Sequence, residues 1–266
     1  MPKVKINDIQ IYHEVHGEGF PLIMIMGLSA NIDWWNPHLI EELSKKFRLV
    51  IFDNRGAGRT DISDKKYTIK LFADDTARLM DALGISRAHV LGISMGGMIA
   101  QELVLNYHEK VEKLVLCSTT CGGPKSVSPS QEALEMLTAE KNMLSEEEVA
   151  RMIMPFLLTS DFIANNPDLV EFRIRQILKV PISNEAYIRQ LNAIIKFDTY
   201  ERLPQIKVPT LILHGKRDAL MPPENASILA KAIPNTQLVY LENSAHELAE
   251  DLEKAISILL NFLVES

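Results

Sequence analysis

The sequence of 266 residues is 47% hydrophobic and 24% charged, which is ordinary for a globular protein and enough for one sizeable core with an insertion. A net charge of −7 without any basic run argues against a nucleic-acid partner, and apolar runs such as residues 22–28 are too short to span a bilayer. Two cysteines, Cys117 and Cys121, cannot form a disulfide framework, so we expect a cytoplasmic protein with no membrane partner.

Short apolar runs alternate with helical patterns along the first part of the chain. We expect two edge strands at residues 4–6 and 9–15, followed by strands at 22–26, 48–52, 90–93 and 111–117. Apolar residues at helical spacing predict helices at 34–46, 71–83 and 95–104. This alternation predicts an α/β fold, with crossover units and a mostly parallel sheet covered by helices on both faces.

The alternation is interrupted between residues 121 and 195, where no strand pattern is found. Four helix starts are indicated there by N-cap or proline signals, at Ser128-Pro129, Ser145, Asn166-Pro167 and Ser183. Strands and helices then resume, with strands at 210–213 and 237–241 and helices at 223–232 and 248–264. We therefore expect a core domain of residues 1–120 and 196–266, interrupted by a helical insertion of residues 121–195.

Ser94 lies between the strand at 90–93 and the helix at 95–104, flanked by Gly92 and Gly96 as Gly-x-Ser-x-Gly. A strand that becomes a helix within one residue forces that residue into a strained backbone conformation. The residues two positions away must then be small, because the chain folds back on itself. Such a turn presents the serine at a sharp point beside a helix N-terminus, which is the nucleophile elbow. The alternative is a glycine-rich turn with an incidental serine.

A serine hydroxyl needs a base to accept its proton, and the base needs a carboxylate to orient it. Asp218 follows the strand at 210–213, and His246 follows the strand at 237–241. In a parallel sheet these strand ends lie on one edge, where the elbow also lies. The order Ser, Asp, His along the chain is that of the α/β-hydrolase fold. We therefore expect Ser94, Asp218 and His246 to be catalytic.

The whole chain resembles the α/β-hydrolase superfamily, of the lid-bearing serine esterase, lipase and lactonase type. The matching segments are Met26-Gly27-Leu28, Asp53-Asn54-Arg55-Gly56-Ala57-Gly58, Gly92-Ile93-Ser94-Met95-Gly96-Gly97, His214-Gly215-Lys216-Arg217-Asp218 and Ser244-Ala245-His246. The resemblance implies Ser94 as nucleophile, His246 as general base and then acid, Asp218 as the orienting carboxylate, and residues 121–195 as a cap.

The same resemblance implies an oxyanion hole formed by the backbone N–H groups of Leu28 and Met95. The family usually has His-Gly in the first of these loops, whereas this sequence has Met26-Gly27. Because the donors are backbone groups, we expect the fold to tolerate this change. We expect no cofactor and no metal, because the histidines have no carboxylate or cysteine partner at the spacing of metal ligands. The one sequence that begins like a zinc-protease helix, at His246-Glu247, has Glu250 where the second histidine would stand.

Residues near the expected triad and in the insertion are apolar, which favours a small or medium uncharged ester with an apolar acyl part. We expect Trp35, Met152, Phe156 and Leu220 to contact this small-molecule substrate. No arginine or lysine is obviously placed to hold an acidic substrate. Asp53 and Arg55 are expected to brace loops and His214 to be structural.

The expected activity is therefore hydrolysis of carboxylic esters through an acyl-serine intermediate. Lactone hydrolysis, carbon–carbon bond hydrolysis, a haloperoxidase-like perhydrolase activity and a non-catalytic ligand receptor stay open as alternatives. Dehalogenase and epoxide hydrolase activities are disfavoured, because their nucleophile would be an aspartate at position 94. The sequence leaves the oligomeric state open between a monomer and a homodimer.

Overall fold

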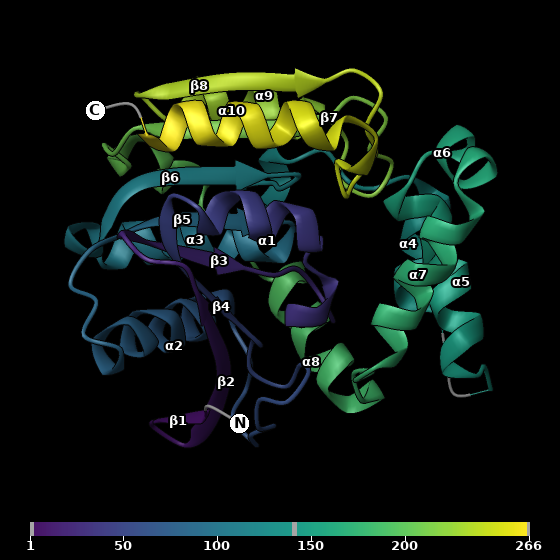
Figure 1. Cartoon of the computed structure of the whole chain (residues 1–266), viewed down its shortest axis with the longest axis horizontal. Helices are drawn as coiled ribbons and strands as arrows, with labels where there is room; N and C mark the ends of the chain where they lie inside the picture. Colours follow the sequence, from purple (N-terminus) through teal and green to yellow (C-terminus); the bar gives the residue numbers. More distant parts are fainter. Residues whose placement is uncertain (1–2, 140–142, 265–266) are drawn as a thin grey trace.

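A computed structural model describes residues 3–139 and 143–264 (Figure 1). Its centre is an eight-stranded sheet with the strand order β1-β2-β4-β3-β5-β6-β7-β8. The strands are β1 (Lys3–Ile6), β2 (Ile9–His16), β3 (Phe20–Ile25), β4 (Phe47–Phe52), β5 (Ala88–Ile93), β6 (Val111–Cys117), β7 (Thr210–Gly215) and β8 (Thr236–Leu241). Only the β1–β2 and β2–β4 pairs are antiparallel, so the predicted mostly parallel sheet is confirmed.

Helices cover both faces of the sheet, as predicted (Figure 1). On one face lie α1 (Pro37–Ser44) and α10 (Leu252–Val264), and on the other lie α2 (Ile69–Ala82), α3 (Met95–Asn106) and α9 (Glu224–Ala232). Strand β3 shows the cause, because its successive side chains point to opposite faces. Leu22 and Met24 pack with α1 and α10, whereas Ile23 and Ile25 pack with the other three helices.

Five helices lie beside the carboxyl ends of the parallel strands (Figure 1). They are α4 (Gln131–Thr138), α5 (Glu146–Leu157), α6 (Ser160–Asn165), α7 (Pro167–Leu178) and α8 (Asn184–Ile195), and we call them the helical segment. Helices α4, α5 and α7 share a hydrophobic cluster that also includes Leu220 of the loop after β7, whereas Ala193 of α8 packs into the core of the sheet. Within the described part of residues 121–195, the only β pairing is a bridge between Gly122 and Asp198.

Several predicted helix starts are confirmed by their caps. Ser145 and Glu148 form the capping box of α5, Pro167 is the first residue of α7, and the Ser183 side chain accepts the N–H of Ala186 at 3.2 Å. The start at Ser128 is wrong, because the side chain that caps α4 is that of Ser130. Helix α6 was not predicted; with six residues it is too short for a periodic pattern.

Three other predictions need correction. The strand at 9–15 is not an edge strand, because β2 pairs with both β1 and β4. The helix expected at 34–46 is split, since Pro37 begins α1 and leaves Asn36 extended. The last helix begins at Leu252, because Leu248 adopts a left-handed conformation with φ of 59°.

The remaining helical turns are short 3-10 turns at Ile32–Trp34, His108–Lys110, Gly123–Lys125, Tyr200–Gln205 and Ala249–Asp251. Among the residues that the structure describes, no helix combines the length and hydropathy needed to cross a membrane.

Candidate active site

Ser94 is the single residue between β5 and α3, with φ of 57° and ψ of −121°. Positive φ is strained for a residue with a side chain, so the surroundings must hold it in place. The Ser94 N–H donates to the carbonyl of Cys117 at 2.9 Å, and the Thr119 hydroxyl donates to the Ser94 carbonyl at 2.7 Å. The N–H and the carbonyl of Ser94 are therefore both held, by the last residue of β6 and by the segment that follows this strand.

The glycines around Ser94 permit close approach of the backbone. A Cβ on Gly92 would lie 2.2 Å from the Gly96 carbonyl oxygen, and one on Gly96 would lie 2.0 Å from the Ile25 carbonyl oxygen. Both distances are far inside van der Waals contact. Glycine is thus required at both positions by backbone that crosses them, which is the physical basis of the Gly-x-Ser-x-Gly pattern.

Asp218 and His246 form a buried pair. The Nδ1 of His246 lies 2.8 Å from Oδ2 of Asp218, and Oδ1 of Asp218 accepts the N–H groups of Leu220 at 2.9 Å and Met221 at 2.7 Å. Because the ionised carboxylate only accepts, Nδ1 carries the proton and Nε2 is left as the basic nitrogen.

Charge and burial act in opposite directions on this pair. Burial raises the pKa of Asp218, but the positive charge and hydrogen bonds that His246 and His214 offer it outweigh burial and lower it. Burial lowers the pKa of His246, but the charge and hydrogen bond of Asp218, with a contribution from Glu247, outweigh burial and raise it. The site therefore holds an ionised carboxylate and a strengthened imidazole base.

Ser94 and His246 line the same cavity, of about 150 Å³. The loop after β3 passes beside the serine, since a Cβ on Gly27 would lie 3.1 Å from Ser94 Cβ. Leu28 follows in this loop and also lines the cavity. Within residues 3–139 and 143–264, the N–H groups of Leu28 and Met95 donate to no acceptor. The Leu28 amide is thus available to an oxygen that enters the cavity, whereas Met95, directly after Ser94, is buried and is not among the residues that line it.

The residues expected to contact substrate fall in different places. Trp35 and Leu220 line the cavity that holds Ser94. Met152 lines a second cavity, of about 310 Å³, between the loop after β3 and helices α4, α5 and α8. Phe156 lines neither cavity, because Ile153 and Leu157 take the face of α5 that points to the first one. Phe156 packs instead on the hydrophobic cluster of the helical segment.

The two cavities are neighbours. Four residues line both of them, namely Ser29, Trp34, Ile153 and Tyr187. The second cavity is otherwise mostly apolar, with methionine, leucine, isoleucine and valine side chains along its wall. A ligand at Ser94 would therefore find further apolar space beyond these four residues.

One cationic side chain does line the first cavity, contrary to the expectation from sequence. Arg173 of α7 reaches the cavity and pairs with Glu247, the residue after His246. The sequence signal was weak, since the two partners are 74 positions apart. Glu247 thus offsets the positive charge that Arg173 brings to the cavity wall.

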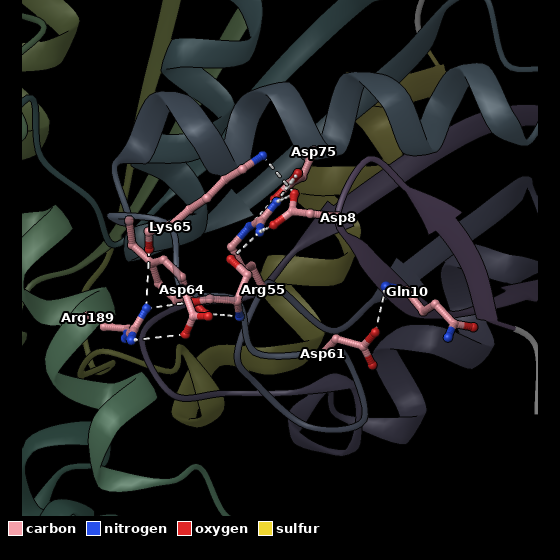
Figure 2. A network of polar contacts seen from close by, with 10 residues as sticks. Asp8, Gln10, Arg55, Asp61, Asp64, Lys65, Asp75 and Arg189 are labelled. Carbon is pink, nitrogen blue, oxygen red and sulfur yellow. Dashed lines mark hydrogen bonds and ion pairs between the residues drawn. The ribbon is translucent and has the colours of Figure 1, made fainter.

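The loops beside the cavity are braced by buried polar groups. Asp53 accepts the N–H groups of Ile32 and Arg59, each at 2.7 Å, and burial raises its pKa to about 6. Figure 2 shows Arg55 between Asp8 and Asp75, with Nη2 2.7 Å from Asp75 Oδ1. The contacts of Asp53 and Arg55 therefore brace the loops that carry them, as expected from the sequence.

The helical segment contributes to this bracing. Arg189 of α8 donates to the Ser63 carbonyl at 2.6 Å (Figure 2). Next to it, the buried Gln190 accepts the Ser29 N–H at 2.9 Å and donates to the Arg55 carbonyl at 3.0 Å. Residues far apart in sequence thus fix the loop that carries Leu28, and no local pattern could have predicted Gln190.

His214 lies beneath the pair of Asp218 and His246. Its ring is fully buried, with Nε2 2.8 Å from the Met221 carbonyl and 3.4 Å from Asp218 Oδ2. It supports the loop that carries Asp218 and does not line the cavity. Among the described residues, no group of three or more histidine, cysteine, aspartate or glutamate side chains is arranged to hold a metal ion.

Comparison with known proteins extends over nearly the whole chain. A family model described as alpha/beta hydrolase fold matches residues 21–251. RutD of Azorhizobium caulinodans, named as a proposed carbamate hydrolase, is 29% identical over 246 residues, 92% of this chain and 91% of RutD. The poly(3-hydroxyalkanoate) depolymerase of Ectopseudomonas oleovorans is 30% identical over 91% of this chain and 84% of the depolymerase. The enol-lactonase structure from Burkholderia xenovorans has a TM-score of 0.86 at 26% identity, covering 99% of this chain and 100% of that chain.

Proposed function

The chain belongs to the alpha/beta hydrolase fold family, and on that premise we propose that it is a serine hydrolase of carboxylic esters. The observation that carries the proposal is the placement of Ser94 on a strained turn in one cavity with His246, whose Nδ1 is bonded to Asp218. Acyl transfer needs a nucleophile, a base and a carboxylate that orients the base, and we propose Ser94, His246 and Asp218 for these roles.

In the proposed reaction, Ser94 Oγ attacks the ester carbonyl carbon while His246 Nε2 takes the hydroxyl proton. The carbonyl oxygen becomes negative and accepts the N–H groups of Leu28 and Met95, each of which contributes roughly 3 kcal/mol to the transition state. The carbon–oxygen bond then breaks, His246 returns the proton to the leaving alcohol, and an acyl-serine remains. A water molecule, deprotonated by His246, releases the acid and regenerates Ser94.

The cavities favour an uncharged substrate with an apolar chain. Around Ser94 the wall is formed by side chains such as Leu28, Trp35 and Leu220. The adjoining apolar cavity offers about 310 Å³, so a substrate longer than the first cavity has a place to extend. We propose a small-molecule ester of small to medium size.

The helical segment is proposed to act as a cap over this site, formed by residues 121–195 between the two parts of the core domain. Its Ile153, Leu157 and Arg173 line the cavity that holds Ser94. A wall contributed by the insertion would exclude water from the acyl-serine and select the substrate by shape.

Ester hydrolysis is tested with p-nitrophenyl esters of increasing acyl length, with Ser94→Ala beside the wild type. We expect hydrolysis by the wild type, an optimum at a short or medium acyl chain, and loss of activity in Ser94→Ala. A folded wild-type protein that cleaves none of these esters would overturn the proposal.

Lactone hydrolysis is the second candidate, and the similarity to the enol-lactonase favours it. A lactone is a cyclic ester, so the same groups would open it. Carbamates belong in the same substrate panel, because RutD is named for them. The kcat/KM values for matched open-chain esters, lactones and carbamates decide among the three, and a preference above about 100-fold for either of the last two would replace ester hydrolysis as the main activity.

A further inference from the structure

Arg173 on α7 contacts both loops that carry the proposed hydrolytic groups. Its Nε donates to Glu247 Oε1 at 3.1 Å and Oε2 at 3.0 Å, and its Nη2 also donates to Oε1. On the other side, Nη1 donates to the carbonyl oxygen of Trp34 at 2.8 Å, and the guanidinium carbon lies 4.7 Å from the centre of the Trp34 ring. Glu247 directly follows His246, and Trp34 lies in the segment that follows Leu28. One guanidinium thus joins the base's loop to the oxyanion-hole loop.

The pair is built for fixed geometry. The side chains of Arg173 and Glu247 are 14% and 17% exposed, and both residues line the cavity that holds Ser94. The Glu247 N–H also donates to the carbonyl of Leu157 at 3.1 Å, at the end of α5. A planar guanidinium that binds a carboxylate through two nitrogens holds it in both distance and direction. The loop of His246 is therefore tied to two helices of the helical segment.

Resting on the function proposed above, we propose that Arg173 is a positioning residue which, through Glu247 and the Trp34 carbonyl, sets the place of His246 relative to the oxyanion hole. Arg173 does not take part in proton transfer. It acts through the two loops that it joins, so its loss should lower kcat more than it raises KM. A shift of about 1 Å between reacting groups typically costs about 100-fold in rate.

The pair also sets the charge around His246. Among the described residues, Asp218 and Glu247 act on the charge of His246. Around them lie His214 beside Asp218, Glu250 beside Ala245 in the loop of His246, and Arg173 of α7 beside Glu247. Burial lowers the pKa of His246, whereas Asp218 and then Glu247 raise it. Arg173 offsets the charge of Glu247. Removal of one member of the pair should therefore shift the pKa of His246 in the direction opposite to removal of the other.

The experiment measures kcat, KM and the pH profile of kcat/KM on the best ester for Arg173→Met, Glu247→Gln, the double variant and Arg173→Lys. The acidic limb is the pH below which kcat/KM falls because His246 is protonated. Glu247→Gln should move this limb to lower pH, and Arg173→Met should move it to higher pH, each by roughly half a pH unit. The double variant should return the limb close to the wild-type value. The kcat should fall by about 10-fold or more in Arg173→Met and in the double variant, and Arg173→Lys should recover part of the loss.

Arg151→Met is the matched control. Arg151 also binds a glutamate through two nitrogens, Glu171 of α7 at 2.6 and 3.0 Å, but it is half exposed and outside both cavities. The Arg151→Met variant should therefore have the same kcat and the same acidic limb as the wild type.

Two outcomes are distinguishable. The positioning role would be overturned if Arg173→Met and Glu247→Gln changed neither the acidic limb nor kcat. Ester hydrolysis would still stand if Ser94→Ala were inactive in the same assay. If Arg173→Met does not fold, the positioning role would be overturned by an unshifted acidic limb in Glu247→Gln together with a wild-type kcat in Arg173→Lys. Absence of hydrolysis by folded wild-type protein would overturn both.

Discussion

At the scale of single residues, the proposed chemistry depends on an ionised Asp218, although only 3% of the surface of this residue is exposed. An unpaired buried carboxylate would take up a proton. Here two backbone N–H groups and His246 donate to it, and its charge in turn favours the protonated imidazole. The same contacts that stabilise the carboxylate therefore raise the pKa of His246, as the proposed proton transfer requires.

The pH dependence of hydrolysis follows from this pair. The pKa of His246 is raised above its ordinary value of 6.5, and only the neutral ring can accept the Ser94 proton. We expect kcat/KM to be constant at alkaline pH and to fall about tenfold per pH unit below a limb that lies above pH 6.5. A profile from pH 5 to 9 on a neutral ester checks this. Constant activity across that range in a folded protein would remove His246 from the mechanism.

Ser94 and His246 should act as a unit. Because the base is useful only to the nucleophile, Ser94→Ala and His246→Ala should each lower kcat by about 10⁴-fold or more, and the double variant should be little worse than either. Single-turnover and steady-state rates on one p-nitrophenyl ester measure this. Losses that multiply in the double variant would mean that the two residues have independent roles.

The candidate residues that the sequence predicts are those with local signals, and the sequence does not reveal residues whose partners lie far away in the chain. Ser94 is marked by its flanking glycines, and Asp218 and His246 by their places after two strands. Arg173 and Gln190 carry no such signal, because they are ordinary residues within amphipathic helices. Their importance comes from partners that only the fold brings close.

At the scale of secondary-structure elements, α8 is tied to the loop of Leu28 by Gln190, which is fully buried. Gln190→Leu would leave the Ser29 N–H and the Arg55 carbonyl without partners, at a cost of about 2–4 kcal/mol. We expect a Tm lower by about 5 °C or more and a reduced kcat, because Ser29 adjoins Leu28, whose amide is proposed for the oxyanion hole.

The matched control for this prediction is Gln131→Leu in α4. Gln131 is exposed, and within the described part of the chain its side chain bonds that of Glu135 alone, so its loss should change neither Tm nor kcat. Thermal unfolding of both variants decides the matter, and equal Tm values for the two would show that the buried bonds of Gln190 contribute nothing.

The elbow between β5 and α3 gives a second prediction at this scale. Gly96→Ala would place a Cβ 2.0 Å from the Ile25 carbonyl, so β3 and α3 would have to separate, at a cost of more than about 3 kcal/mol. Gly84→Ala meets no atom within 4 Å and pays only for its φ of 68°, about 1–2 kcal/mol. Urea unfolding compares them, and a Gly96→Ala protein as stable as Gly84→Ala would contradict the close approach.

The spacing of apolar residues was enough to predict which segments form helices or strands. Where each element begins and ends depended on local backbone chemistry. The capping box of Ser145 and Glu148 was readable because both partners lie within one turn. The break before Pro37 and the left-handed Leu248 were missed, because the apolar spacing runs on through both positions. Strand β2 was assigned to an edge because nothing in residues 9–15 reveals that β4 pairs with it.

At the scale of the whole molecule, the site exists because the sheet order brings β5, β7 and β8 to one side of β3. The parallel arrangement could be inferred from the alternation of strands and helices. The order itself could not, since it rests on pairings between strands that are far apart in sequence. The approach of the helical segment to this edge likewise depends on contacts such as those of Arg173 and Gln190.

Whole-molecule stability should depend on a histidine in the sheet that takes no part in the site. His89 is buried on β5 between Phe20 and Phe47, with ring centroids 4.7 and 5.7 Å away, and its Nδ1 has no partner among the described residues. Burial, together with the charge of Lys113, lowers its pKa to about 4. The unfolded chain then binds a proton near pH 6.5, before the folded protein does. The contribution of His89 to stability is complete above pH 6.5 and is lost as pH falls toward 4.

His89→Phe should remove this loss. Relative to wild type, the variant should gain about 2 kcal/mol in the free energy of unfolding between pH 7.5 and pH 5, as measured by urea unfolding. Comparison of the two proteins cancels opposing groups such as Asp53, whose raised pKa makes the fold take up a proton in the same range. The same substitution at the exposed His108 is the matched control. If the difference in free energy of unfolding between His89→Phe and the wild type did not vary with pH, the folded protein would have to accommodate a protonated His89.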